Sequence, residues 1–242
     1  MPSIGTLHGS SYQSKTVRIL ALANYVGAEL EYKEISIPKG DTKTPEYLAK
    51  FPWGKLPAFE GSDGFCVTES CAITRYIAAT APNHKDQLLG SDPKTAAKID
   101  LWSNWGDAEI FDNGALVHRM YWGGLPYSKP LEQFGLDNLN RALAYLDKTL
   151  ATTTFLVGHR ITVADISVAS NIRILYTTMF GPEIRSKYPN VLRYLNTVVH
   201  QPGFGDAFSK DFKLATATLK YTPPKKEEKP KAAAAPAAPA AK

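Results

Sequence analysis

The stretch from residue 51 to residue 70, FPWGKLPAFEGSDGFCVTES, constrains the fold more than any other part of the chain. Two short apolar runs, at 58–60 and 65–67, are joined by a glycine-containing turn, a pattern that predicts a β-hairpin. Pro57 precedes the first run, a position that suits a residue unable to donate a hydrogen bond to a sheet. An X-Pro bond can be cis. A cis bond here would turn the backbone N–H and C=O of Leu56 outward, free to bind an extended ligand.

Glu69 and Ser70 follow the hairpin and open the next predicted helix, at 69–79. The first N–H groups of a helix have no partner within the helix, and they carry a partial positive charge that attracts carboxylates. A free backbone edge beside such a helix start suits a small peptide with an acidic end.

The elements before the hairpin predict a parallel crossover. A strand at 4–8 is followed by a helix that starts near Lys15 and ends at Gly27, and then by an alternating run at 30–35 that we expect to form a half-buried strand. A short helix with Pro45 in its first turn leads into the hairpin. The order βαβ–ββα predicts a thioredoxin-like domain over residues 1–82.

The whole chain has the pattern of an α/β domain followed by an all-α domain. A polar linker at 83–92 precedes an all-helical domain at 93–215, which starts with one long helix reaching towards Trp122. A second helix carries a leucine stripe too short for a coiled coil, so it is expected to be a core face. The stripe consists of Leu136, Leu139, Leu143, Leu146 and Leu150.

Thr162 and Asp165 have the spacing of a capping box, at the start of a helix that is apolar on most sides. Such a helix should be buried in the middle of its domain. After it, residues 216–242 are rich first in Lys and Glu and then in Ala and Pro. A segment of this composition has little to bury, so we expect a disordered tail.

Composition excludes several function classes. The net charge is +5, of which five lysines and two glutamates after Tyr221 supply +3, so the globular part is too weakly basic to indicate direct nucleic-acid binding. Two cysteines, Cys66 and Cys71, form neither a disulfide framework nor a metal-ligand pattern. No signal peptide and no apolar run of membrane-spanning length is recognisable. We therefore expect a cytoplasmic protein without a metal and without a membrane segment.

The motif GKLPAF followed by ES-AI--Y resembles the glutathione-binding core of the soluble glutathione transferases. Within that superfamily, FPWGKLPAFEGSDGFCVTES and TFLVGHRITVADI resemble the transferase-like domain of the gamma subunit of the eukaryotic translation elongation factor 1 complex. The resemblance covers roughly residues 4–215 and implies the same two-domain fold. It further implies glutathione as ligand or substrate, a homodimer, and the nucleotide-exchange subunits of that complex as partners. The implied function is a glutathione-binding scaffold, and the alternative is an active transferase that conjugates glutathione to electrophiles.

The resemblance also implies the roles of five binding residues. Lys55 would pair with a carboxylate of glutathione, and Leu56, beside a cis Pro57, would bind its cysteinyl unit through the backbone. Glu69 would bind the α-amino group and Ser70 the carboxylate of the γ-glutamyl end. The alternative for Glu69 and Ser70 is simple capping of the helix.

A transferase must also lower the pKa of the glutathione thiol, which is ordinarily near 8.5. A hydroxyl group that donates to the sulfur near a helix N-terminus does this. Ser14 stands four residues before Arg18, the spacing of the serine-using transferase classes, and is our first candidate. Ser11 and Tyr12 are alternative donors. A further possibility is that this chain has no such donor. Ser14 could also be no more than the N-cap of the first helix.

Overall fold

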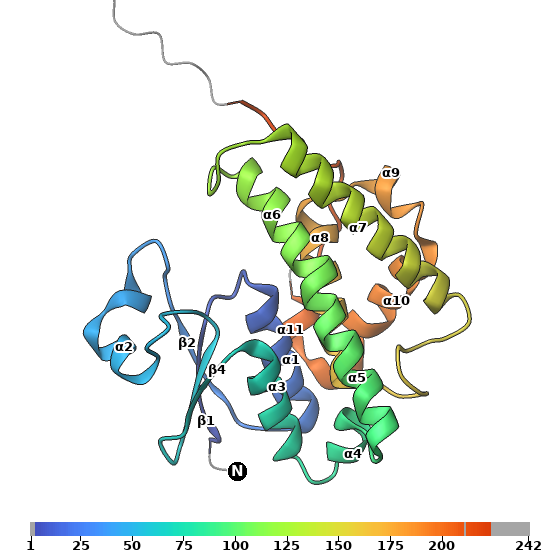
Figure 1. Cartoon of the computed structure of the whole chain (residues 1–242). Coiled ribbons are helices and arrows are strands. Elements are labelled where there is room, and N and C mark those ends of the chain that lie inside the picture. The colour runs from blue at the N-terminus through green and yellow to red at the C-terminus, as the bar shows by residue number, and fades with distance from the viewer. Residues whose placement is uncertain (1–2, 211, 224–242) are drawn as a thin grey trace, which may run out of the picture.

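The computed structural model describes residues 3–210 and 212–223, which form a small α/β unit beside a larger helical unit (Figure 1). The α/β unit contains one mixed sheet with the strand order β2-β1-β3-β4. β1 pairs with β2 in parallel and with β3 antiparallel, and β3 and β4 form the predicted hairpin. The strands are β1 (Gly5–Gly9), β2 (Glu31–Glu34), β3 (Ala58–Gly61) and β4 (Cys66–Thr68).

The helices of this unit follow the sequence signals closely. α1 ends where Gly27 adopts a left-handed conformation with φ 68°, which glycine adopts at little cost. Thr44 caps α2, because its side chain accepts a hydrogen bond from the Tyr47 N–H and Pro45 occupies the first turn. The thioredoxin-like prediction is confirmed. These elements are α1 (Ser14–Val26), η1 (Asp41–Lys43), α2 (Pro45–Lys50) and α3 (Ser70–Ala79).

The predicted half-buried second strand at 30–35 is shorter in the structure, and the four residues of β2 are all exposed. Only the flanking Leu30 and Ile35 are covered. β2 is the edge strand of the sheet and pairs only with β1 among the described strands. Its aromatic residue, Tyr32, donates its hydroxyl proton to Glu34 on the same strand. Alternating residue types therefore indicated a strand here, but not which of its faces is covered.

The helical unit confirms the predicted all-α second half (Figure 1). The expected long first helix exists as α5, a π-helical turn η2, and α6, which follow one another without a break. The region predicted as a linker contains a further helix, α4, whose Leu88 and Leu89 are buried in the main core. The helices are α4 (Lys85–Leu89), α5 (Pro93–Trp105), η2 (Gly106–Phe111), α6 (Asp112–Tyr121), α7 (Lys129–Leu150), α8 (Val163–Thr178), α9 (Pro182–Arg185), α10 (Pro189–Val199), η3 (Pro202–Phe204) and α11 (Asp206–Ser209).

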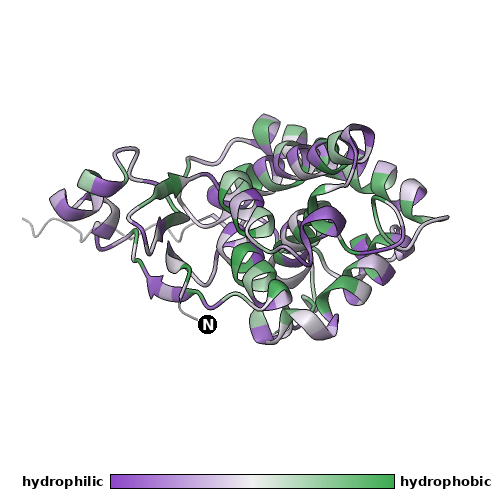
Figure 2. Cartoon of the chain, turned by 90° about the horizontal axis from the view of Figure 1, so that it is seen from below, coloured by the Kyte–Doolittle hydropathy of each residue, from purple (hydrophilic) through white to green (hydrophobic). Residues whose placement is uncertain are grey.

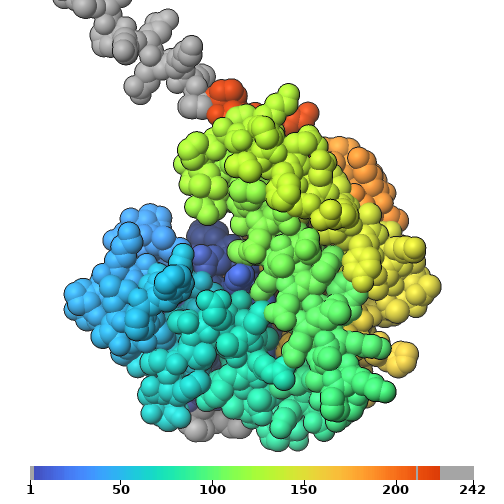
Figure 3. Space-filling model, in the orientation of Figure 1, coloured from blue at the N-terminus to red at the C-terminus, as the bar shows by residue number. Residues whose placement is uncertain are grey.

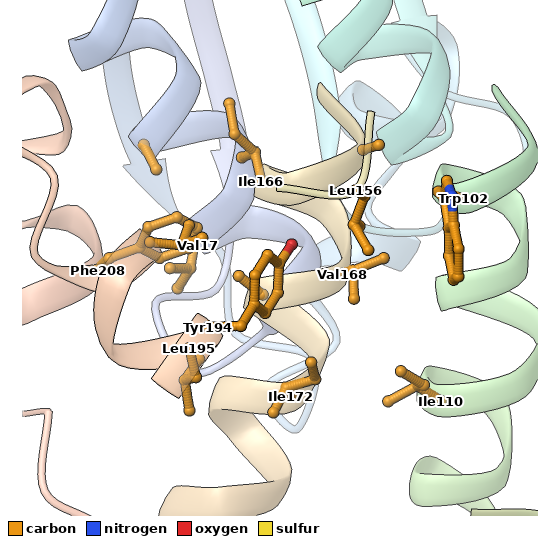
Figure 4. Packing of buried hydrophobic residues seen from close by; sticks show 14 of the residues in the cluster. Val17, Trp102, Ile110, Leu156, Ile166, Val168, Ile172, Tyr194, Leu195 and Phe208 are labelled. Carbon is orange, nitrogen blue, oxygen red and sulfur yellow. The ribbon is translucent and has the colours of Figure 1, made fainter. Parts of the chain in front are cut away.

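α8 lies at the centre of the molecule, as its apolar composition predicted. Figure 4 shows Ile166, Val168 and Ile172 of α8 surrounded by side chains from the neighbouring helices. Most other helices carry both hydrophobic and hydrophilic residues, as amphipathic helices around a core do (Figure 2). The residues packed around α8 include Val17 of α1, Trp102 of α5, Ile110 of η2, Tyr194 of α10 and Phe208 of α11.

The C-terminal segment is ordered further than predicted. The expectation of disorder from residue 216 is wrong for residues 216–221, which pack against the end of α8. Leu219 donates its N–H to the Met179 carbonyl at 2.8 Å, and Tyr221 stacks on Tyr127. Leu219 and Tyr221 give this segment apolar surface to bury. The average composition of residues 216–242 did not indicate this, because most of the tail is polar or rich in Ala and Pro. The Lys/Glu and Ala/Pro-rich part, residues 224–242, lies outside the described residues.

Candidate functional site

Three segments of the chain meet at one edge of the sheet. In the sheet register His8 lies opposite Ala58, and Ala58 lies opposite Thr68. The next residues in each direction are the β1–α1 loop, the Leu56–Pro57 pair, and the Glu69–Ser70 pair. The geometry of the sheet therefore brings together three of the sequence segments that carry the predicted site residues.

The segment before β3 presents free backbone at this edge. The Leu56–Pro57 peptide bond is cis, as the sequence analysis anticipated. Within the described residues, neither the N–H nor the C=O of Leu56 has a hydrogen-bond partner. The loop is held from behind, because the Tyr47 hydroxyl donates to the Lys55 carbonyl at 2.7 Å. Lys55 itself has an exposed side chain. The arrangement offers one donor and one acceptor to an extended ligand.

The Glu69–Ser70 pair forms the start of α3 with an unusual backbone. Glu69 is the N-cap of α3 and has φ 68° and ψ 116°, and it is the only non-glycine residue with a positive φ in the described part of the chain. Such a conformation costs on the order of 1–3 kcal/mol and tends to occur at functional sites. The exposed Glu69 side chain makes no capping hydrogen bond, and Ser70 is 3% exposed. Simple capping by the Glu69 side chain therefore does not explain this corner.

A cleft lies in front of this edge. Figure 3 shows a hollow between the α2 lobe and α6, with residues of the β1–α1 region at its floor. The Lys15 ammonium group lies 4.2 Å from the centre of the Phe111 ring, a cation–π contact between α1 and η2. Burial raises the pKa of the Asp112 carboxyl, and the nearby Lys15 charge opposes that shift. The cleft is thus bordered by both units of the fold.

Ser14 lies at the boundary between the two units. It is the first residue of α1 and is 4% exposed, and its hydroxyl donates to Asn171 Oδ1 of α8 at 3.0 Å. The Asn171 amide nitrogen donates to the Gly106 carbonyl and to Asp107, which fixes the orientation of the amide. The N-cap of α1 is Gln13, so the alternative interpretation of Ser14 as an N-cap is wrong.

The two alternative donors are placed differently from Ser14. Tyr12 is 86% exposed. Ser11 is exposed and donates its backbone N–H to the Glu34 carboxylate at 3.1 Å. Of the three candidates, Ser14 is the one whose hydroxyl group is held by the helical unit, through Asn171.

Next to Ser14, a buried ion pair joins the two units. Arg18 of α1 is fully buried and its guanidinium pairs with the Asp107 carboxylate of η2 through both terminal nitrogens. Burial alone would raise the pKa of Asp107, but the Arg18 charge and hydrogen bonds hold it below its usual value. The Cys71 thiol donates to Asp107 at 3.3 Å, and burial raises the pKa of this thiol. Ser14 is therefore backed by a rigid, charged network.

Sequence reasoning missed Asp107 and Asn171. The signal that could have found them was a polar residue on the apolar face of a helix. Arg18 stands among the buried residues of α1, and Asn171 among those of α8. A buried charge needs a partner, but the sequence does not say from which element the partner comes.

Trp53, two residues before Lys55, is 71% exposed. It lines a pocket of about 430 Å³ together with Pro52 and Thr68. In the described part of the chain, no group of three or more His, Cys, Asp or Glu residues is arranged to hold a metal ion. Among the same residues, no helix is long and apolar enough to cross a membrane.

Comparison with known proteins identifies the family. Models of the N-terminal and C-terminal domains of glutathione S-transferase match residues 4–79 and 115–202. Elongation factor 1-gamma of Sus scrofa is 38% identical over 195 residues, which are 78% of this chain and 43% of that protein. The chain thus spans less than half the length of the curated relatives it matches.

Solved structures agree with this assignment. The GST-like domain of elongation factor 1-gamma from Saccharomyces cerevisiae is 27% identical and superimposes with a TM-score of 0.77, covering 92% of this chain and 99% of that one. Poplar glutathione transferase F1 is 25% identical with a TM-score of 0.76, covering 86% of this chain and 97% of its own. The chain therefore belongs to the glutathione transferase superfamily, and over most of its length it is similar to elongation factor 1-gamma.

Proposed function

We propose that this chain is a glutathione-binding, transferase-like module of the elongation factor 1-gamma type, which scaffolds nucleotide-exchange subunits in the cytoplasm as a homodimer. The similarity to elongation factor 1-gamma supports the scaffold role. Membership of the glutathione transferase superfamily supports glutathione as the ligand. The free backbone of Leu56 and the Glu69–Ser70 corner support a ligand site at this edge of the sheet.

In this proposal glutathione lies along the sheet edge as an extended peptide. The backbone of Leu56, beside Pro57, binds the cysteinyl unit through two hydrogen bonds. Its N–H donates one of them and its C=O accepts the other. The exposed Lys55 pairs with the glycyl carboxylate. Glu69 receives the α-amino group of the γ-glutamyl end, and Ser70, at the N-terminus of α3, receives its carboxylate.

The strained backbone of Glu69 at the meeting point of three segments carries this proposal. The test is calorimetric titration of the full chain with glutathione, comparing the wild type with Glu69→Ala. A matched control is Asp137→Ala, which removes an exposed carboxylate from α7. We expect Glu69→Ala to weaken binding by tenfold or more and the control to leave it unchanged. Equal affinity in all three proteins would refute the binding role of this corner.

The scaffold role is tested separately, by mixing the chain with purified nucleotide-exchange subunits and measuring complex formation by size-exclusion chromatography with light scattering. Co-elution with a defined stoichiometry supports the scaffold, and separate elution at micromolar concentration contradicts it. The same measurement on the chain alone gives its oligomeric state, for which we expect twice the monomer mass.

One observation favours catalysis as a second candidate function. Ser14 lies at the N-terminus of α1, on the same sheet edge, with its hydroxyl held by Asn171. In the transferase reaction the glutathione thiol loses its proton to the solvent, and the thiolate sulfur bonds to an electrophilic carbon while a leaving group departs with the bonding electrons as halide. Ser14 would have to turn its proton from Asn171 to the sulfur to stabilise that thiolate. The alternatives, Ser11 and Tyr12, keep exposed hydroxyl groups.

Conjugation of a chlorodinitrobenzene, with glutathione affinity measured in parallel, tests this candidate in the wild type, Ser14→Ala, Ser11→Ala and Tyr12→Phe. A loss of tenfold or more in turnover with unchanged binding identifies the thiolate donor. Binding without turnover in every form would leave a scaffold with a ligand site and no catalysis.

A further inference from the structure

A second pocket lies beside the α6–α7 turn of the helical unit, and none of its lining residues belongs to the glutathione edge. It has a volume of about 390 Å³, within the range of small-molecule sites. Its walls come from four parts of the chain: the α6–α7 turn, α7, the end of α8 with α9, and the C-terminal segment 212–221. The lining includes Tyr121, Tyr127, Glu132, Phe180, Leu219 and Tyr221.

The C-terminal segment that forms one wall is fixed to the helical unit by several hydrogen bonds. The Ala215 N–H donates to the Tyr176 carbonyl at 2.8 Å, and the buried Arg185 guanidinium donates to the Ala215 carbonyl at 2.8 Å. The Gly181 N–H donates to the Thr218 hydroxyl oxygen at 2.9 Å. A Cβ on Gly181 would lie 2.4 Å from the Thr218 nitrogen, so the two backbones fit only with glycine here. The pocket is therefore preformed. Figure 1 shows the segment passing beside the start of α7.

Aromatic rings from the α6–α7 turn and from the C-terminal segment meet around the Glu132 carboxylate. Lys220 also lines the pocket, but its side chain is exposed and its charge acts on the Glu183 carboxylate. Tyr127 and Tyr221 stack with their ring centres 3.7 Å apart and their planes within 2°. The Tyr127 hydroxyl donates to Glu132 at 2.7 Å, and the Tyr121 hydroxyl donates to the other carboxylate oxygen. Burial and this carboxylate raise the pKa of the Tyr121 phenol, and the hydrogen bond to Glu132 raises the pKa of Tyr127, so both phenols stay protonated and act as donors. Three tyrosine rings are thus gathered around one half-buried carboxylate.

We infer that this pocket binds a small planar aromatic molecule that carries a cationic nitrogen. The rings and the aliphatic floor suit the aromatic body, because stacking contacts add to the burial of apolar area. The carboxylate and the tyrosine faces both attract a cation. A neutral aromatic ligand would gain only the first of these interactions, and an anionic one would meet Glu132. The inference is independent of the glutathione proposal, since none of its residues lies at the sheet edge.

The probe for this inference is proflavine, a fluorescent planar cation, with anilinonaphthalene sulfonate as its anionic counterpart. Binding to the full chain is followed by fluorescence anisotropy in the wild type, Glu132→Gln, Tyr221→Ala and Phe111→Ala. Glu132→Gln keeps the shape and an acceptor oxygen but removes the charge. Phe111→Ala is the control, because it removes an aromatic ring that contacts Lys15 of α1 and does not line this pocket. Circular dichroism and the thermal midpoint of each variant report whether it is folded.

We expect one proflavine per chain, weakened at least tenfold in Glu132→Gln and in Tyr221→Ala and unchanged in Phe111→Ala. The sulfonate should bind more weakly than proflavine to the wild type. The inference is overturned if proflavine does not bind below about 1 mM, if Glu132→Gln binds it as tightly as the wild type, or if Phe111→Ala abolishes binding. Should Tyr221→Ala fail to fold, the Glu132→Gln result alone decides.

Discussion

A single buried arginine connects the α/β unit to the helical unit. The Arg18 side chain is fully buried, and its guanidinium contacts Asp107 of η2 as well as the Ser167 hydroxyl at 3.3 Å. A buried charge without a partner is strongly destabilising, whereas a complete pair contributes little compared with apolar residues of the same size. The value of this pair is therefore that it admits only one arrangement of α1 against η2 and α8.

Removing one member of this pair should be far more costly than removing both. We expect Arg18→Met to lower the free energy of unfolding by about 3–5 kcal/mol, because Asp107 is left largely buried with its charge uncompensated. The double variant Arg18→Met, Asp107→Leu should recover much of that loss. Urea denaturation measures all of these values. The exposed pair Arg75–Asp100 is the matched control, and Arg75→Met should cost less than about 1 kcal/mol. A double variant as unstable as Arg18→Met would contradict this account.

His8 on β1 gives the stability a dependence on pH. It is 7% exposed between the rings of Tyr47 and Phe51, and burial, followed by the Lys33 charge, lowers the pKa of its imidazole below 6.5. Glu60, 3.7 Å from Nε2, opposes that shift, and Lys50 adds to it.

Because the unfolded chain then binds a proton more readily than the folded one, the contribution of His8 to stability is complete above its unfolded pKa of about 6.5 and declines as the pH falls below it. We expect the unfolding free energy of the wild type to fall between about pH 7 and pH 5 more steeply than that of His8→Phe, which keeps the ring contacts. His118, whose pKa is also lowered by burial, leaves some slope in the variant. Parallel pH profiles for the two proteins would show that His8 is not responsible.

At the scale of elements, α8 is fixed at its start by the side chain of Asp165. This carboxylate is buried and accepts from the Thr162 N–H at 2.9 Å, from the Thr162 hydroxyl at 3.1 Å and from the Leu156 N–H at 2.9 Å. It thereby completes the capping box and also holds the loop before α8 in place.

Thr162→Ala should therefore destabilise the chain by about 0.5–2 kcal/mol, since the hydroxyl that contacts Asp165 is lost while the backbone bond remains. Ser128, the N-cap of α7, makes no capping hydrogen bond with its side chain, so Ser128→Ala is the control and should change stability by less than about 0.5 kcal/mol. Chemical denaturation of both variants checks the difference. Equal losses would mean that the contact with Asp165 does not stabilise α8.

These elements show which features a sequence can reveal. The hairpin, the start of α8 and the end of α1 at Gly27 were predictable, because turns and caps depend on residues a few positions apart. The exposure of β2 and the Ser14–Asn171 bond depend on elements that lie far apart in the chain. Neither a local period nor a local motif contains that information. The packing of Leu219 and Tyr221 was missed for the same reason, because their partners on α8 and the α6–α7 turn are distant in sequence.

At the scale of the whole molecule, the two units share one core. A single cluster of buried residues includes Leu7 of β1 and Phe59 of β3 as well as residues of every long helix in the other unit. α1 belongs to the sheet by sequence, yet it packs on α8 and carries both Ser14 and Arg18 into the boundary. Each unit therefore buries much of its apolar surface against the other, whereas Tyr47, Phe51 and Ala58 form a separate small cluster within the α/β unit.

We accordingly expect the chain to unfold in one cooperative transition, although it contains two units and exceeds the usual size of a two-state domain. Tryptophan emission reports mainly on the helical unit, where Trp102, Trp105 and Trp122 lie, and far-UV circular dichroism reports on both units. The two signals should give the same urea midpoint and the same slope. Arg18→Met weakens the boundary and leaves each unit's other contacts intact. It should therefore separate the urea midpoints of the two transitions more than Thr162→Ala or His8→Phe does. Separate transitions in the wild type would show that the shared core does not couple the units, and that the site between them is assembled from two independently stable parts.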